Sequence, residues 1–158
     1  MPHKPRAAAL AAKHTMALAI AALAFTFIVA FSIRAFAQDA VPQSDALATQ
    51  QVINDQIAAF KAGDGERAYS HAAPSIKQVF TTVDRFMGMV QTGYMPLYNP
   101  DSFVFGRNAF ISGQVHQEVI VTDPQGKQWQ AVYTLVRQPD GSWKINGVKL
   151  NPYTGANA

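Results

Sequence analysis

The sequence has 158 residues and a formal net charge of +3, and it contains no cysteine. The lack of cysteine excludes a disulfide framework, thiolate chemistry and a lipid anchor on an N-terminal cysteine. Four basic residues and no acidic residue lie in the first 37 positions, whereas the rest carries nine basic and ten acidic side chains. The positive charge therefore belongs to the N-terminal segment, and we expect no nucleic-acid partner.

The first 37 residues have the organisation of a secretory signal peptide. Lys4, Arg6 and Lys13 precede an uncharged, mostly apolar run of 18 residues at 16–33, and the AFA at 35–37 has the form of a cleavage site. We therefore expect a periplasmic or secreted protein. A run of this length also just spans a bilayer, so an uncleaved inner-membrane anchor with the domain in the periplasm is the alternative. Membrane contact is expected through this segment alone.

After the leader we expect a tether at 38–43, one folded domain at 44–153 and a tail at 154–158. The first half of the domain has helical periodicity. Ser44 is the expected N-cap of a helix that runs to Lys61, and its apolar stripe holds Ile53, Ile57 and Phe60. Asp64 and Thr82 are the expected N-caps of further helices at 65–72 and 83–91, with one helical turn opening at Ser75 and a loop at 94–100.

After Pro100 the apolar period changes to two, which indicates strands. An extended segment begins at Phe103, and strands are expected at 113–122, 127–138 and 142–150. Two turns of the form x-Pro-x-Gly-x, at 123–127 and 138–142, predict three-residue hairpin loops. These loops set the register and place Gln117 opposite Tyr133. A change of parity along the last strand predicts a β-bulge at 146–147. The expected fold is α+β, with N-terminal helices packed on a curved antiparallel sheet.

Three segments carry a family resemblance: VINDQIAAFKAGDGERAYSHAAP, FMGMVQTGYMPLY and DGSWKINGVKL. From about residue 52 to 152 the chain resembles a family of small exported bacterial proteins, the domain of unknown function 4864. The resemblance implies a nuclear transport factor 2-like (cystatin-like) α+β cone. That superfamily includes ketosteroid isomerases, dehydratases and non-enzymatic binding or dimerising modules, so the fold does not choose a function. The family supplies no catalytic residues to transfer.

A polar pair is expected on the apolar, helix-facing side of the sheet. The predicted register makes Gln117 and Tyr133 cross-strand neighbours there. One interpretation is a polar handle in an apolar ligand pocket. That pocket would also be lined by residues of the third helix and the loop after it, namely Phe86, Met87, Val90 and Tyr94. The other interpretation is a structural hydrogen bond between the two polar side chains.

A second polar group is expected on the opposite face of the sheet. His116, Glu118 and Gln130 share this face, which is either solvated or a surface for a partner protein or a second copy of the chain. Only one further histidine, His71, follows the leader. Zinc normally takes three or four His, Cys or carboxylate ligands, so no metal site is expected.

The residues favour binding over catalysis. No carboxylate is expected on the inner face, and no nucleophile motif, phosphate loop or cofactor motif occurs. We therefore expect no catalytic residue and no cofactor. The hypothesis is a non-enzymatic exported module that binds a small apolar ligand or an envelope protein. The alternative is an isomerase or dehydratase that uses Tyr133 as a donor, which requires a carboxylate or imidazole at the cavity.

Overall fold

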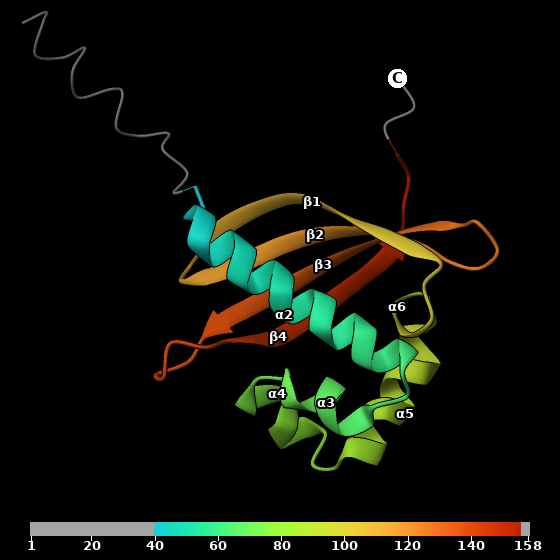
Figure 1. The fold of residues 1–158 in the computed structure, drawn as a ribbon, viewed down its shortest axis with the longest axis horizontal. Helices are drawn as coiled ribbons and strands as arrows, with labels where there is room; N and C mark the ends of the chain where they lie inside the picture. The colour runs from blue at the N-terminus through green and yellow to red at the C-terminus, as the bar shows by residue number, and fades with distance from the viewer. Residues whose placement is uncertain (1–39, 156–158) are drawn as a thin grey trace, which may run out of the picture. The chain divides into compact units, whose positions relative to one another are not determined.

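The computed structural model describes residues 40–155, in which helices α2 to α6 precede a four-stranded antiparallel sheet (Figure 1). The expected signal segment at 1–37 lies outside the described residues, as does the start of the tether. Within 40–155, no helix is both long enough and apolar enough to cross a membrane. Helices pack against an open, curved sheet, which confirms the predicted α+β class.

The helices are α2 (Gln43–Lys61), α3 (Gly65–Ser70), α4 (Pro74–Val79), α5 (Val83–Gly93) and α6 (Met95–Tyr98). Two predicted N-caps are confirmed. The Asp64 carboxylate accepts a hydrogen bond from the backbone N–H of Arg67 at 3.0 Å. The Thr82 hydroxyl accepts one from the N–H of Arg85 at 3.3 Å. In both cases the side-chain oxygen satisfies an N–H that has no partner within its helix.

Three local expectations are wrong. Ser44 is not the cap of α2, because the helix already begins at Gln43 and the Pro42 carbonyl accepts its first backbone hydrogen bonds. The helical turn expected to open at Ser75 begins one residue earlier, at Pro74, whose missing N–H leaves no hydrogen bond unmade. The expected loop at 94–100 contains the short helix α6. The first two errors lie at helix ends, where backbone geometry decides more than side-chain type.

The strands are β1 (Ser102–Ile111), β2 (Gln114–Thr122), β3 (Gln128–Arg137) and β4 (Trp143–Pro152), and they pair in the order β1-β2-β3-β4. The predicted register is confirmed, with Gln117 opposite Tyr133. Gly126 and Gly141 occupy the left-handed region of both loops, at φ +79° and +86°. Proline and glycine in each loop therefore fixed the alignment of three strands.

Each outer strand carries one bulge. In β4, Leu135 pairs with Ile145 whereas Thr134 pairs with Gly147, so Asn146 is the extra residue, as predicted. In β1, Gly106 and Arg107 together lie opposite Glu118. Bulges bend a strand and increase its twist, and the two together account for the curvature of the sheet.

Gln117 and Glu118 hold the β1 bulge from opposite faces. The Gln117 amide donates to the carbonyls of Gly106, at 3.1 Å, and Arg107, at 3.3 Å. Its own oxygen accepts from Gln50 of α2 at 3.2 Å. Glu118 accepts from the Arg107 N–H at 3.2 Å, and a Cβ at Gly106 would lie 2.4 Å from its carboxylate. Glycine at 106 therefore allows the carboxylate to cover the bulge.

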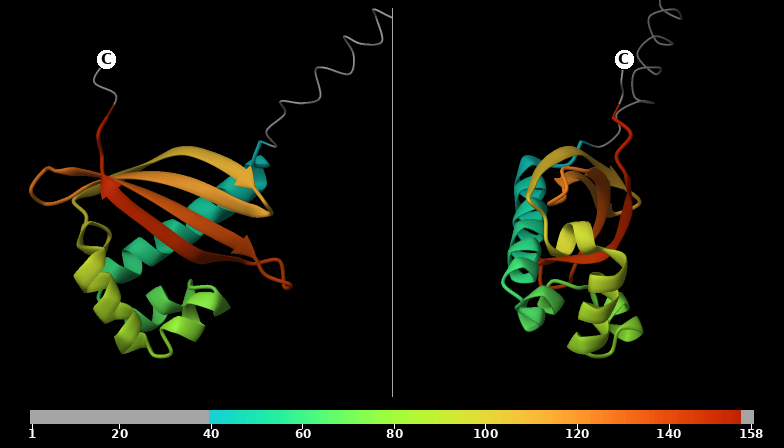
Figure 2. Two further views of the ribbon diagram at one scale, coloured as in Figure 1. Left: turned by 180° about the vertical axis from the view of Figure 1, so that it is seen from behind. Right: turned by 90° about the vertical axis from the view of Figure 1, so that its right-hand side faces the viewer.

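Two hydrophobic clusters fill the interior. One lies between α2 and the sheet and is built on residues such as Ile53, Ile57 and Val119. The other joins α2 to α3 and α5 through residues such as Phe60 and Phe86. Figure 2 shows α2 along one face of the sheet, with α3, α4 and α5 gathered below the β4 edge. The two clusters meet where these helices approach β3 and β4.

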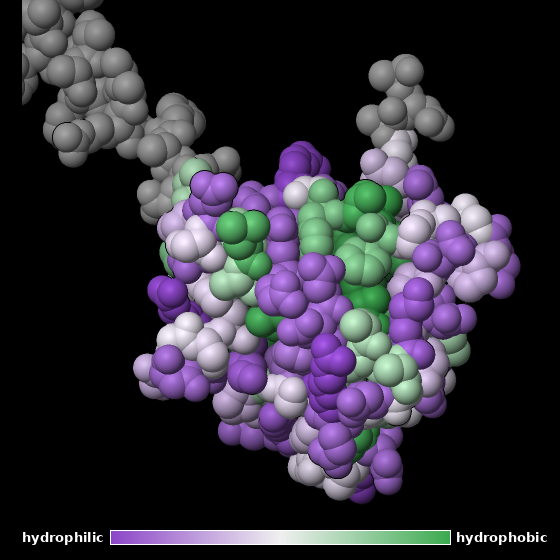
Figure 3. Space-filling model, in the orientation of Figure 1, coloured by the Kyte–Doolittle hydropathy of each residue, from purple (hydrophilic) through white to green (hydrophobic). Residues whose placement is uncertain are grey.

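The outer surface of the protein on the α2 side is mostly polar. Figure 3 shows this face, with apolar side chains gathered beside α2 over the sheet. The half-buried rings of Phe103 and Phe105 on β1 pack edge to face at 5.8 Å and extend the sheet cluster toward its margin. Val104 between them is 63% exposed on the other side of the strand.

Gln117→Leu is expected to lower the free energy of unfolding by about 1–3 kcal/mol, because two carbonyls of the β1 bulge lose a buried donor. Urea unfolding followed by circular dichroism measures the change. Gln128→Leu, on the exposed end of β3, is the matched control and should change stability by less than about 0.5 kcal/mol. Equal effects of the two substitutions would contradict this role for Gln117.

Candidate functional site

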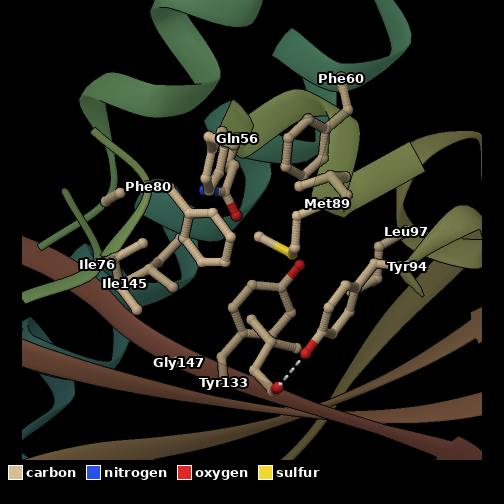
Figure 4. Close-up of a pocket in the computed structure, with 14 residues that line it drawn as sticks. Gln56, Phe60, Ile76, Phe80, Met89, Tyr94, Leu97, Tyr133, Ile145 and Gly147 are labelled. Carbon is tan, nitrogen blue, oxygen red and sulfur yellow. Dashed lines mark hydrogen bonds between the residues drawn. The ribbon is translucent and has the colours of Figure 1, made fainter. Parts of the chain in front are cut away.

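A cavity of about 280 Å³ lies where the two hydrophobic clusters meet (Figure 4). Fourteen residues line it, and they come from both the helices and the sheet. Its volume is close to the lower end of the range found for ligand pockets. The cavity is therefore suited to a compact molecule rather than to a long chain.

The sheet supplies one wall of the cavity, made by Tyr133, Ile145, Gly147 and Val148. Ile145 pairs with Leu135, and Val148 pairs with Tyr133. The β3 partners are two positions apart along the chain, whereas the β4 partners are three positions apart. In a regular strand, residues three positions apart point to opposite faces, and the bulge at Asn146 absorbs the extra position. The bulge therefore brings both apolar side chains to the cavity.

The helices and the segments that join them supply the other walls, made by Gln56, Phe60, Ala72, Ile76, Phe80, Phe86, Met89, Val90, Tyr94 and Leu97. Phe86, Met89 and Val90 stand at i, i+3 and i+4 of α5 and share one face. The segment before α4 is fixed to β4 by backbone hydrogen bonds. The Ala73 N–H donates to the Ile145 carbonyl at 2.8 Å, and the Ile145 N–H donates to the His71 carbonyl at 2.9 Å.

Tyr133 carries an unpartnered polar group into this apolar space. Its side chain has no exposed surface, and its hydroxyl makes no hydrogen bond with any residue in 40–155. In Figure 4 the hydroxyl points from β3 into the cavity. Burial raises the pKa of this phenol well above its ordinary value of 10.0, so it stays protonated and remains a donor.

Gln56 contributes a second polar group from α2. Its side chain is 3% exposed, and its amide nitrogen donates to the Ala68 carbonyl at 3.2 Å. Because only the NH₂ end can donate to a carbonyl, this bond fixes the orientation of the amide. Figure 4 shows the amide oxygen directed into the cavity. The lining thus presents a fixed acceptor as well as the Tyr133 hydroxyl.

The remaining lining is uncharged. No carboxylate, imidazole, ammonium or guanidinium group is among the fourteen lining residues. The Tyr94 hydroxyl is already engaged, because it donates to the Val148 carbonyl at 3.1 Å. His71 precedes the lining residue Ala72 but does not itself line the cavity, and burial lowers the pKa of its imidazole from the ordinary value. The lining therefore contains no carboxylate or imidazole that could act as a base.

The domain of unknown function DUF4864 has a family model that matches residues 42–158. The chain belongs to the DUF4864 family. The match covers every helix and strand of the described residues, including every residue that lines the cavity. No curated protein matches this sequence.

Four of the six expected pocket residues of this DUF4864 domain lie on the cavity: Phe86, Val90, Tyr94 and Tyr133. Met87 does not. It packs on the other side of α5 against Gly65, where an added Cβ would lie 3.1 Å from it, and Met89 takes its place. Gln117 does not line the cavity either, because it is fully buried and its amide is bound to the β1 bulge. Gln117 and Tyr133 are paired in register, but no hydrogen bond between their side chains occurs in 40–155.

The expected interaction residues lie together on the outer face of the sheet. Glu118 accepts hydrogen bonds from Gln130 and from the Arg107 backbone, and both lower the pKa of its carboxyl, the Gln130 bond more strongly. The His116 ring lies 3.4 Å from the Thr134 hydroxyl. These polar groups are engaged within the DUF4864 domain. Among the described residues, no cluster of three or more His, Asp or Glu could hold a metal.

The sequence contains a signal that marks Gln56 as a candidate site residue. The apolar stripe of α2 has Ile53, Ile57 and Phe60, and Gln56 occupies the i+3 position of the same stripe. A polar residue on an apolar helix face must find a partner inside the protein or at a site. Met89 had no comparable signal, because the choice between Met87 and Met89 depends on the rotation of α5.

Tyr133→Phe is expected to raise the free energy of unfolding of the DUF4864 domain by about 1–3 kcal/mol, because it removes a buried hydroxyl without a partner. Tyr94→Phe is the matched control and should lower it by about 1 kcal/mol, since that hydroxyl bonds Val148. Urea unfolding of the two variants measures both. A loss of stability in Tyr133→Phe would show that the hydroxyl has a protein partner.

Proposed function

We propose that this protein is an exported binding module whose cavity holds a small, mainly apolar ligand. The observation that carries the proposal is the Tyr133 hydroxyl, which is fully buried, has no partner in 40–155 and faces an apolar cavity. A hydroxyl in this state costs free energy in the unliganded domain. A ligand oxygen that accepts from Tyr133 recovers that cost upon binding.

The lining favours binding rather than catalysis. An isomerase or dehydratase needs a base within hydrogen-bond reach of the reacting carbon, and no carboxylate or imidazole lines this cavity. The rings of Phe60, Phe80 and Phe86 offer faces and edges to an apolar molecule instead. We accordingly assign Tyr133 the role of orienting a ligand.

Met89 is the lining residue best suited to admit the ligand. It extends from α5 toward the Tyr133 hydroxyl, which projects from the opposite wall (Figure 4). Its unbranched thioether side chain adjusts at low cost. In this proposal, Met89 moves aside when a ligand reaches the hydroxyl.

The N-terminal segment and the order of the helices and strands support two further parts of the proposal, which are export and superfamily membership. Export rests on the basic start of the chain, the apolar run at 16–33 and the AFA at 35–37. The periplasm is the proposed site of action. The order of helices before a bent meander, with a cavity between the two, supports membership of the nuclear transport factor 2-like superfamily.

Met89→Trp tests whether this cavity is the binding site. The indole should fill the cavity and weaken the binding of naphthalene, an uncharged apolar probe, at least tenfold in a calorimetric titration. Met95→Trp is the matched control, because Met95 is 50% exposed and lies outside the cavity lining; it should bind like the wild type. Circular dichroism shows whether both variants fold. Undiminished binding by folded Met89→Trp would place the ligand elsewhere, and failure of the wild type to bind any uncharged aromatic probe would remove the proposal.

A further inference from the structure

The two polar groups in the cavity, considered together, specify the polar part of the ligand. Tyr133 offers a protonated hydroxyl, and Gln56 offers an amide oxygen whose orientation is fixed by the bond to Ala68. No hydrogen bond joins the two side chains, although both line the same space. A ligand group that contacts both must accept one hydrogen bond and donate another.

A hydroxyl group meets this requirement. The hydroxyl oxygen accepts a hydrogen bond from Tyr133, and the hydroxyl O–H donates one to the Gln56 amide oxygen. A ketone or an ether accepts from Tyr133 but leaves the Gln56 oxygen without a donor, and an unpaired buried acceptor weakens binding. A site built around both groups therefore discriminates against an oxygen without a proton.

Charged ligands are disfavoured by the same lining. A carboxylate would lose its hydration, meet no cation among the lining residues and face the Gln56 oxygen. An ammonium group would meet no carboxylate in the cavity. The five aromatic rings of the lining favour a flat, apolar body.

We propose that the cavity selects small uncharged aromatic alcohols, of the phenol class, through a hydrogen bond from Tyr133 and a second one to Gln56. This selectivity rests on the proposed binding function and adds the chemical class of the ligand. Tyr133 and Gln56 are its specificity-determining residues.

Three uncharged probes of nearly equal shape test the proposal: naphthalene, 2-methoxynaphthalene and 2-naphthol, each titrated calorimetrically into protein purified from cells that express the whole chain. The wild type should bind 2-naphthol at least tenfold more tightly than 2-methoxynaphthalene, although the methyl ether is the more apolar of the two. The anion 2-naphthoate should bind more weakly than naphthalene.

Two variants assign the effect to the two residues. Gln56→Met keeps the volume of the side chain and removes the acceptor, so the preference for 2-naphthol over the ether should fall below threefold. A purely steric rejection of the methyl group would persist in this variant and would overturn the role of Gln56. Gln51→Met, an exposed position on the same helix, is the matched control and should keep the wild-type preference. Tyr133→Phe should weaken both oxygen-containing probes relative to naphthalene.

The outcomes separate the two proposals. Binding of naphthalene with a preference for 2-naphthol of less than tenfold would overturn the selectivity and leave the binding function standing. Failure of the wild type to bind any uncharged probe would overturn the binding function itself.

Discussion

The cavity depends on a single extra residue in strand β4. Ile145 and Val148 are three positions apart, and they face the same side of the sheet only because strand β4 is bulged at Asn146. The bulge also lies where the helical layer is attached, since residues 71 and 73 exchange backbone hydrogen bonds with Ile145, and Ser75 contacts the Asn146 side chain. The same part of β4 therefore holds the helical layer and supplies one wall of the cavity.

Two buried polar residues on neighbouring strands of the sheet play opposite roles. Gln117 and Tyr133 are register partners and are both fully buried. The amide of Gln117 is bound to the carbonyls of the β1 bulge, so it stabilises the fold. The Tyr133 hydroxyl has no such partner among the described residues. Buried polar groups are nearly always satisfied, and a tyrosine that departs from this rule inside a cavity is the strongest indication of a binding site in the domain.

Much of the sheet was predictable because its determinants are local. Two proline–glycine loops set the register, and the change of parity between Ile145 and Val148 located the bulge. The register also placed Tyr133 on the inner face of the sheet, and the helical period placed Phe86 and Val90 on one face of α5. The sequence could not show that Met89 rather than Met87 lines the cavity, because this depends on how α5 packs against α3. The partners of Gln117 were also unpredictable, because they belong to the β1 bulge, and nothing in the sequence around Gly106 marks that bulge as clearly as Asn146-Gly147 marks the other. The start of α2 could not be predicted from a capping side chain, because the Pro42 carbonyl accepts the first hydrogen bonds of the helix and no side chain caps it.

In the proposed binding mode, the Tyr133 hydroxyl donates a hydrogen bond to the ligand. Carbon-13 NMR of protein labelled at the ζ carbon of tyrosine tests it most directly, because the chain has five tyrosines and Tyr133→Phe identifies the resonance of Tyr133 by its loss. On titration with 2-naphthol, this resonance should move further than any other, while that of Tyr153, which lies outside the cavity lining, stays in place. Binding of 2-naphthol that leaves the Tyr133 resonance unchanged would contradict the account.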